Sequence, residues 1–449
     1  MRETHFGFAP QYTPLNHGSY GTLPEGRRIL PSCSHLTRAL FFVRLRLFSR
    51  PSLLAESRSL TADVLNCAAS DLVFVPNATR GVDTVLKNVR WRSGDVNPGL
   101  RDRVRGREAR GSTGSPIMTR PPTERMVTRS RRSGWKSCPI AFPETDDRIV
   151  WRRWSGRRGG LNNTSDSEGG DGGRRDERVR LAIVDTIVSM AGLRVPFERL
   201  VPALQAEGAM VLFDAAHGIG QIPIDIATLP DFLVTNLHKW FFVPRGCAAL
   251  YVAKRIQALI RASLPTSARY RGSSAVKKDE KENAFVDLFD FVATSDTTNW
   301  LTAEIHFRNE ICCGEEAIRE YIKAVTLQGA EAAAEILGTE VMRKEGSWML
   351  DCAARKRPET NDEGIGADNG KIDKERGRVD PSHAAKIVLW IKETGIRENG
   401  NYFQTCLYRG KFWWRLSGMI YVHVGDFRRG AEVLKRLCER DQKGEYLGG

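Results

Sequence analysis

Three features are missing from this sequence, and each absence excludes a class of protein. Residues 1–14 contain no apolar core of the kind that a secretory signal peptide has. No run approaches the roughly 18 apolar residues that a membrane-spanning helix needs. The nine cysteines are odd in number and none is spaced Cys-x-x-Cys, which argues against a disulfide framework and a zinc site. We therefore expect a cytoplasmic protein with reduced thiols and with no metal and no membrane partner.

Acidic residues are too few to balance the basic ones, and the imbalance is local. The formal net charge is +14, and residues 98–178 hold 18 Arg and one Lys against 11 Asp and Glu. This segment thus supplies an excess of eight positive charges. It lacks the interleaved aromatic residues of a surface on which nucleic-acid bases stack. A nucleic-acid partner is therefore not favoured, although an Arg-rich interaction segment stays an alternative.

The same segment, 98–178, shows neither strand nor helix periodicity. It is rich in Arg, Gly, Ser, Thr and Pro, a composition typical of disorder. A structureless stretch of this length inside a compact domain is unusual. We interpret it as a lineage-specific insertion or as the product of a retained intron or a frameshift. The 449 residues are enough for two or more domains around this interruption.

Polar residues follow two apolar runs, 209–213 and 232–234, at the point where each run ends. In an open α/β sheet, ligands bind at the carboxyl ends of the strands, so both polar clusters are expected at one site. Asp214 follows the first run, and Lys239 follows the second. A buried Lys opposite a buried Asp suits pyridoxal phosphate, because the amine bonds to the cofactor aldehyde and the carboxylate holds the pyridine nitrogen protonated.

An anion site is indicated earlier in the chain. The apolar run Leu72-Val-Phe-Val75 leads into a polar turn, Pro76-Asn-Ala-Thr79, and a new helix is predicted there. Backbone N–H groups at the start of a helix face and bind phosphate. Capping of the helix by Asn77 or Thr79 is an alternative that is compatible with phosphate binding.

The runs Asp214-Ala-Ala-His217 and Asn236-Leu-His-Lys239 together resemble the signature of class V aminotransferase-fold enzymes, which bind pyridoxal phosphate and have PLP fold type I. Within that family the sequence is most similar to fungal isopenicillin N epimerase-like proteins, a group that includes ergothioneine-pathway lyases of hercynylcysteine sulfoxide. The resemblance covers 12–96 and 179–449 in patches. It implies an α/β fold, with a large domain of mostly parallel sheet flanked by helices and a smaller C-terminal α+β domain, assembled as a homodimer.

The resemblance also implies roles for individual residues. Lys239 would carry the cofactor and act as the base, and Asp214 would hold the ring nitrogen. Beside the ring hydroxyl it places Ser189 and His217. The remaining cofactor residues would lie near the phosphate, and they are Ala78, Thr79, Asn236, His238 and Thr294. Of these, Thr294 would come from the neighbouring subunit.

Three further residues are implied to bind an amino-acid substrate. Asn16 and His17 lie in a turn-rich stretch that covers the active site in the resembled family. A surface histidine is an equally favoured interpretation of His17. Arg415 matches the arginine that binds the substrate carboxylate, a task that suits the bidentate fork of a guanidinium. A surface ion pair is the alternative for Arg415.

These assignments divide the chain into four parts. Residues 1–30 form a segment over the active site, and 31–97 with 179–305 form the large domain. Residues 98–178 are the low-complexity insertion, and 306–449 form the small domain with an exposed loop at 355–379. Helices are expected over 25–66, 195–207, 301–336 and 433–438. A strand is expected over 179–192, ending at small polar residues that include Ser189, and further strands over 246–252 and 411–421.

The favoured reaction is a C–S lyase reaction, in which a sulfur group is eliminated from a cysteine conjugate or its sulfoxide. Aminotransferase, epimerase and cysteine desulfurase activities are alternatives that use the same cofactor. A desulfurase needs a mobile reactive cysteine, and no cysteine has a spacing that suggests one. An inactive remnant is a further alternative, because 98–178 occupies the interval where the family has sheet strands and the residue that stacks on the ring.

Overall fold

The structure is a computed structural model, and it describes a little over half of the chain. Residues 25–49, Thr294 and the loop 355–379 lie outside the described part, as does most of 98–178. The described residues are 2–9, 11–22, 24, 50–91, 95–97, 99–100, 136–137, 178–190, 192–226, 230–264, 270, 284–290, 292, 297–301, 314–339, 341, 351–353, 381–408 and 411–447.

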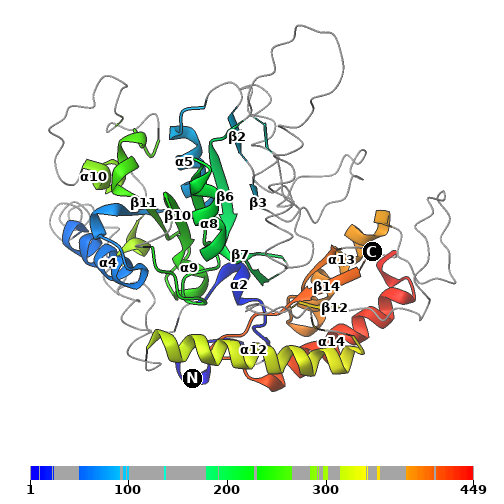
Figure 1. Cartoon of the computed structure of the whole chain (residues 1–449). Coiled ribbons are helices and arrows are strands. Elements are labelled where there is room, and N and C mark those ends of the chain that lie inside the picture. The colour runs from blue at the N-terminus through cyan, green and yellow to red at the C-terminus, as the bar shows by residue number, and fades with distance from the viewer. Residues whose placement is uncertain are drawn as a thin grey trace, which may run out of the picture.

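The largest sheet in the described residues has six strands and is mostly parallel (Figure 1). Its middle strands β6, β9 and β10 are parallel, whereas β11 runs antiparallel to both of its neighbours. The predicted fold class is therefore confirmed. In sheet order the strands are β1 (Leu72–Val75), β11 (Ala248–Val252), β10 (Phe232–Asn236), β9 (Met210–Asp214), β6 (Leu181–Asp185) and β3 (Gly99–Leu100).

Helices cover both faces of this sheet. Every residue of β6 is buried, and alternate residues enter different cores: Ala182 packs with α4 and α8, and Ile183 packs with α5 and α10. Burial on both faces explains why the strands are continuous apolar runs. The four helices are α4 (Arg50–Leu65), α5 (Ala78–Asn88), α8 (Phe197–Ala206) and α10 (Ala284–Asp290).

Part of the segment 98–178 contributes to the sheet. Strand β3 pairs in parallel with β6 at the sheet edge, although the sequence suggested no strand there. Two residues are too few to show an alternating pattern. Two smaller sheets lie nearby, β4–β2–β5 (Lys136–Ser137, Asp95–Asn97 and Arg178–Val179) and β7–β8 (Ile187–Val188 and Leu193–Arg194).

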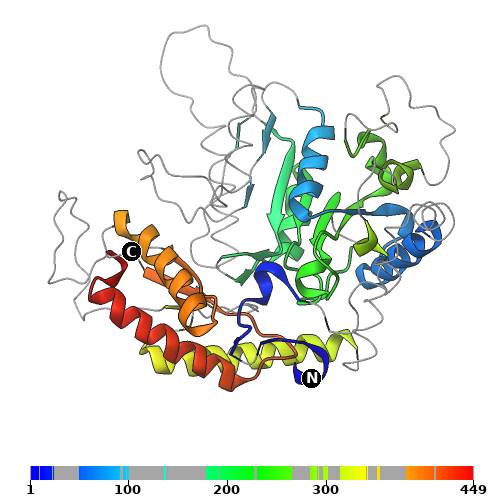
Figure 2. The same cartoon turned by 180° about the vertical axis from the view of Figure 1, so that it is seen from behind.

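The C-terminal part combines a three-stranded antiparallel sheet with three helices. Both views show α12 extending from beneath the large sheet to this part (Figures 1 and 2). Helices α12 and α14 pack closely because Gly329 leaves room for the ring of Phe427, which a Cβ would approach to 2.4 Å. The elements are α12 (Glu315–Leu337), β12 (Asp351–Ala353), α13 (Pro381–Asn399), β13 (Gln404–Tyr408), β14 (Lys411–Arg415) and α14 (Val424–Gln442).

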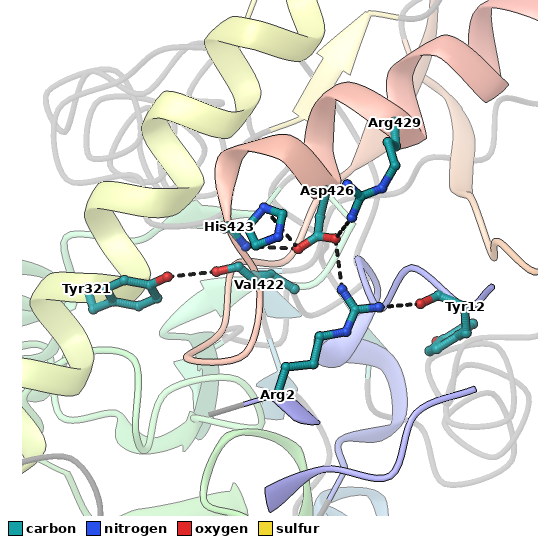
Figure 3. A network of polar contacts seen from close by, with 7 residues as sticks. All are labelled: Arg2, Tyr12, Tyr321, Val422, His423, Asp426 and Arg429. Carbon is teal, nitrogen blue, oxygen red and sulfur yellow. Dashed lines mark hydrogen bonds and ion pairs between the residues drawn. The ribbon is translucent and has the colours of Figure 1, made fainter. Parts of the chain in front are cut away.

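Two short helices, α1 (Arg2–His5) and α2 (His17–Tyr20), connect the N-terminal segment to the rest of the molecule. Figure 3 shows the contact with α14, where the fully buried carboxylate of Asp426 accepts hydrogen bonds from Arg2 and Arg429. The second nitrogen of Arg2 donates to the carbonyl oxygen of Tyr12. One buried carboxylate thus ties Arg2, and through it Tyr12, to α14.

We expect Asp426→Asn to lower the free energy of unfolding by about 2 kcal/mol, because the buried side chain loses the charge that strengthens its hydrogen bonds with Arg2 and Arg429. Urea titration followed by circular dichroism measures the change. The control is Asp83→Asn, since Asp83 contacts Arg80 and Lys87 on an exposed part of α5. For this control we expect a loss of at most about 1 kcal/mol. Equal losses in the two variants would contradict the prediction.

In the described residues, no helix is both long enough and apolar enough to cross a membrane. Over the same ranges, His, Cys, Asp and Glu side chains form no group of three or more that could hold a metal ion.

Candidate functional site

The carboxyl ends of β9 and β10 lie side by side, as the sequence predicts. Val234 pairs with Asp214 across the two strands, and the Ala215 amide donates to the carbonyl of Val234 at 2.8 Å. The hydroxyl of Thr235 donates to the Ala215 carbonyl at 2.7 Å. Asp214 is 7% exposed, and one of its carboxylate oxygens accepts the Ala216 amide. These bonds hold the turn after Asp214 against the turn after β10.

Lys239 and His217 meet between these two turns. Lys239 lies in α9 (Leu237–Trp240), which begins directly after β10, and its Nζ is 2.7 Å from Nε2 of His217. The indole Nε1 of Trp240 donates to Nδ1 of the same imidazole at 3.3 Å. Burial lowers the pKa of His217 well below its usual value. The amine therefore faces a neutral imidazole.

The predicted phosphate cradle is next to this pair. Helix α5 begins at Ala78 directly after β1, and Asn77 caps it by accepting the Arg80 amide. Asn236, at the end of β10, accepts the Ala78 amide at 2.8 Å. Thr79 is exposed at the helix start. The helix N-terminus and the end of β10 are thus joined, an arrangement suited to an anion.

His238 lies on the same short helix as Lys239. Its Nδ1 donates to the carbonyl oxygen of Cys247 at 2.8 Å, which orients the ring. Burial lowers the pKa of His238, while this hydrogen bond raises it. A role for His238 beside the phosphate stays a prediction.

Arg415 connects β14 of the C-terminal part and the N-terminal segment to the site. It ends β14, is 2% exposed, and donates through Nη2 to Asn16 Oδ1 at 2.9 Å and to Ser19 Oγ at 2.6 Å. Nη1 donates to the Ser189 carbonyl at 2.8 Å. All three acceptors are neutral. A carboxylate would form stronger, charge-assisted bonds to the same guanidinium.

The strand expected over 179–192 is shorter than predicted. Strand β6 ends at Asp185, which pairs with Asp214, and the chain then forms the antiparallel β7–β8 pair. Ser189 is therefore exposed in a turn beyond β7. In the sequence, the apolar residues Ile187 and Val188 make the strand look continuous beyond Asp185. The charged residue Asp185 within this apolar run is the feature that could have indicated the end of the strand.

Asp185 and Thr186 are the residues that sequence reasoning missed at this edge. They end the strand next to β9, and the Thr186 amide donates to the carbonyl of Asp214 at 3.1 Å. Asp185 is 9% exposed and Thr186 is fully buried. A carboxylate beside Asp214 makes this end of the sheet more acidic than the sequence indicated.

His17 lies among aromatic side chains instead of on the surface. It is 4% exposed, its Nδ1 forms a hydrogen bond with the hydroxyl of Tyr421, and its ring centroid is 5.0 Å from that of Trp240. Phe242 approaches from another side. Contact of His17 with a substrate stays a prediction. Thr294 lies outside the described residues, so its predicted role is untested.

The residues at this edge fit the cofactor that the sequence suggested. Pyridoxal phosphate needs an amine for its aldehyde, an acid for its pyridine nitrogen and donors for its phosphate. Lys239 and Asp214 would supply the first two, and the N-terminus of α5 would supply the third. Arg415 would add a guanidinium for a substrate carboxylate.

A pH effect on stability follows from the buried imidazole. Below about pH 6.5, His217 is protonated in the unfolded chain but stays neutral in the folded chain. The free energy of unfolding therefore falls as the pH falls, by up to about 1.4 kcal/mol per pH unit. Denaturant titrations between about pH 5 and 7 measure this. We expect His217→Gln to reduce the slope. An unchanged slope in this variant would contradict the assignment.

Comparison with known proteins gives a consistent result. The aminotransferase class-V family matches residues 173–322. An L-cysteine desulfhydrase-like protein of Epichloe uncinata (lolT1) is 32% identical over 97% of this chain and 94% of its own. The hercynylcysteine sulfoxide lyase of Schizosaccharomyces pombe is 26% identical over 97% of this chain and 96% of its own.

Solved structures agree at the level of the fold. The cystine C–S lyase C-DES with its product cysteine persulfide covers 95% of this chain and 97% of its own, with a TM-score of 0.64 at 16% identity. A C-DES mutant with glycine linked to its PLP cofactor gives a TM-score of 0.66 at 17% identity and covers 97% of this chain and 99% of its own. The near full-length match to the Epichloe relative and the shared fold show that this chain belongs to the aminotransferase class-V family of pyridoxal phosphate enzymes.

Proposed function

We propose that this protein is a pyridoxal phosphate-dependent C–S lyase that breaks the Cβ–S bond of cysteine or of a cysteine conjugate. The observation that carries the proposal is the convergence of an amine, an acid and a guanidinium at one end of the sheet. Lys239 contacts His217 directly, and Arg415 is close enough for its charge to lower the pKa of that imidazole. Asp214 ends the strand that leads to the same turn.

Each of these residues has a task in the elimination. Arg415 binds the substrate carboxylate and thereby orients the Cα–H bond. Lys239, as a neutral amine, accepts the Cα proton. Asp214 holds a proton at the cofactor's ring nitrogen, and the cofactor, when bound, delocalises the electron pair left on Cα. The Cβ–S bond then breaks, and sulfur leaves with its electron pair.

The relatives support a lyase rather than the alternatives. Two of them are named for cysteine desulfhydration and hercynylcysteine sulfoxide cleavage. A desulfurase needs a reactive thiolate. Among the four free cysteines in the described part of the chain, burial and the nearby Asp71 and Asp63 raise the pKa of Cys67 to about 12, and Cys247 is buried in the apolar core. An inactive remnant is not favoured, because the described sheet retains the amine and the acid.

The test is product analysis with purified protein and added pyridoxal phosphate. Incubation with L-cysteine, L-cystine and an S-substituted cysteine sulfoxide should release pyruvate and ammonia together with the sulfur product. Alanine as the product would instead indicate a desulfurase, and loss of chirality at Cα without cleavage would indicate an epimerase. Amino transfer to an added 2-oxo acid would indicate an aminotransferase. Any of these three results without pyruvate would refute the lyase.

Finer assignments extend this proposal. The substrate is an ergothioneine-pathway cysteine-conjugate sulfoxide, and the enzyme is a cytoplasmic homodimer. The large domain comprises 31–97 and 179–305, and the small domain comprises 306–449. The cofactor and substrate residues are those inferred from the sequence, including Asn16 and Thr294. Light scattering tests the dimer, and comparison of kcat/KM between the sulfoxide and L-cysteine tests the substrate.

A further inference from the structure

His217 is held between two nitrogen atoms of the same short helix. Trp240 Nε1 lies 3.3 Å from Nδ1 of the imidazole, and Lys239 Nζ lies 2.7 Å from Nε2. Gln221 fixes the backbone by donating to the His217 carbonyl at 2.7 Å. His217 is 2% exposed, so water does not compete for either ring nitrogen. Both hydrogen-bonding positions of the ring are therefore defined by protein groups.

The indole determines which nitrogen of His217 carries the proton. An indole N–H only donates, so Nδ1 must accept and must be unprotonated. An imidazolium carries protons on both nitrogens, so an imidazole that accepts at Nδ1 is neutral and carries one N–H. Burial, which lowers the pKa of His217, favours the same neutral form. That proton is therefore on Nε2. It points at the amine of Lys239.

Lys239 then has to accept this N–H. An ammonium group has no lone pair and cannot accept a hydrogen bond, whereas a neutral amine can. We propose that Trp240 is a positioning residue that fixes the Nε2–H tautomer of His217, and that this tautomer stabilises Lys239 as the neutral amine that bonds to the cofactor and takes the substrate proton. The inference rests on the proposed function only in naming Lys239 as the reacting amine.

The N-terminal segment holds the indole in place. Trp240 is fully buried, and the ring of His17 packs against it at 5.0 Å with an angle of 57°. Gly21, with φ of 65°, lies so close to α9 that a Cβ there would be 1.7 Å from the His238 carbonyl oxygen. We therefore infer that the buried ring of His17 supports the indole of Trp240.

A purely structural role for Trp240 is the competing explanation, and the tautomer distinguishes the two. The protein is labelled with ¹⁵N-histidine, freed of cofactor, and examined by long-range ¹H–¹⁵N correlation NMR, which reports which ring nitrogen is protonated. His217→Gln identifies the His217 signals among the eight histidines. We expect a protonated Nε2 and an unprotonated Nδ1 in the parent. A proton on Nδ1, or on both nitrogens, overturns the proposal.

Two changes at position 240 test the cause. Trp240→Phe removes the N–H donor. Incorporation of 3-benzothienylalanine at the same position replaces the indole N–H with sulfur and keeps the shape of the ring, so it remains informative if the phenylalanine variant does not fold. Both should shift His217 toward the Nδ1–H tautomer and slow cofactor attachment to the cofactor-free protein at pH 7 by about tenfold, the effect of one lost hydrogen bond. An unchanged tautomer in the isosteric variant overturns the proposal.

The matched control is Trp300→Phe. Trp300 is 8% exposed, and its Nε1 donates to the Gly246 carbonyl at 2.9 Å, away from His217. We expect it to leave the His217 tautomer and the attachment rate unchanged. The NMR measurement needs neither cofactor nor turnover. It can therefore confirm or refute the tautomer even if the protein proves not to be a lyase, so failure of this proposal and failure of the proposed function are distinguishable.

Discussion

Replacing Lys239 with alanine is expected to lower kcat by at least about 10³-fold, because the variant loses both the amine that bonds to the cofactor and the base at Cα. The neighbouring His217 cannot substitute for it, since burial lowers the imidazole pKa well below its usual value. Pyruvate release measures kcat. The visible absorbance of the cofactor bonded to the protein measures attachment, and both should be lost together.

The control for this variant is Lys254→Ala. Lys254 begins the exposed 3₁₀ helix Lys254–Leu259 after β11, so its removal changes charge by the same amount without touching the site. We expect parent-like absorbance and kcat. Borohydride reduction followed by peptide mass spectrometry locates the attachment. Attachment at a lysine other than 239 would contradict the assignment.

Replacing Arg415 with lysine is expected to raise KM about 100-fold with a smaller change in kcat. A lysine keeps the charge but cannot bind a carboxylate through two parallel N–H donors, and hydrogen bonds between charged groups are worth about 1.5–3 kcal/mol each. Arg415 also holds Asn16 and Ser19, so the variant loses the link to the N-terminal segment. Steady-state kinetics with a cysteine substrate measures the effect.

A substrate without a carboxylate distinguishes carboxylate binding from a general disturbance of the site. The parent should use an S-substituted cysteamine much more poorly than the matching cysteine, and Arg415→Lys should reduce that preference. The control is Arg440→Lys at an exposed cluster with Glu398 and Glu445, where no kinetic change is expected. A preference that is unchanged in Arg415→Lys would show that the carboxylate binds elsewhere.

Local sequence determined much of the fold and of the site. Apolar runs of four or five residues become strands buried on both faces, and Asp214 and Asn236 end two of them. Since parallel strands end at one edge of a sheet, the sequence was enough to place these residues together. The start of α5 was also predictable, because Asn77 has a side chain that caps a helix.

Tertiary structure decided what depends on contacts between distant segments. The end of β6 is set by its register with β9, and Ile187 and Val188 conceal it in the sequence. His17 is buried because side chains from distant parts of the chain pack around it, among them Trp240 and Tyr421, the second more than 400 residues later. The tautomer that we propose for His217 depends on Trp240, which lies 23 residues later in the chain and donates to Nδ1 of the imidazole. A histidine in a sequence has two equivalent choices for its proton, and only the packed neighbours select one.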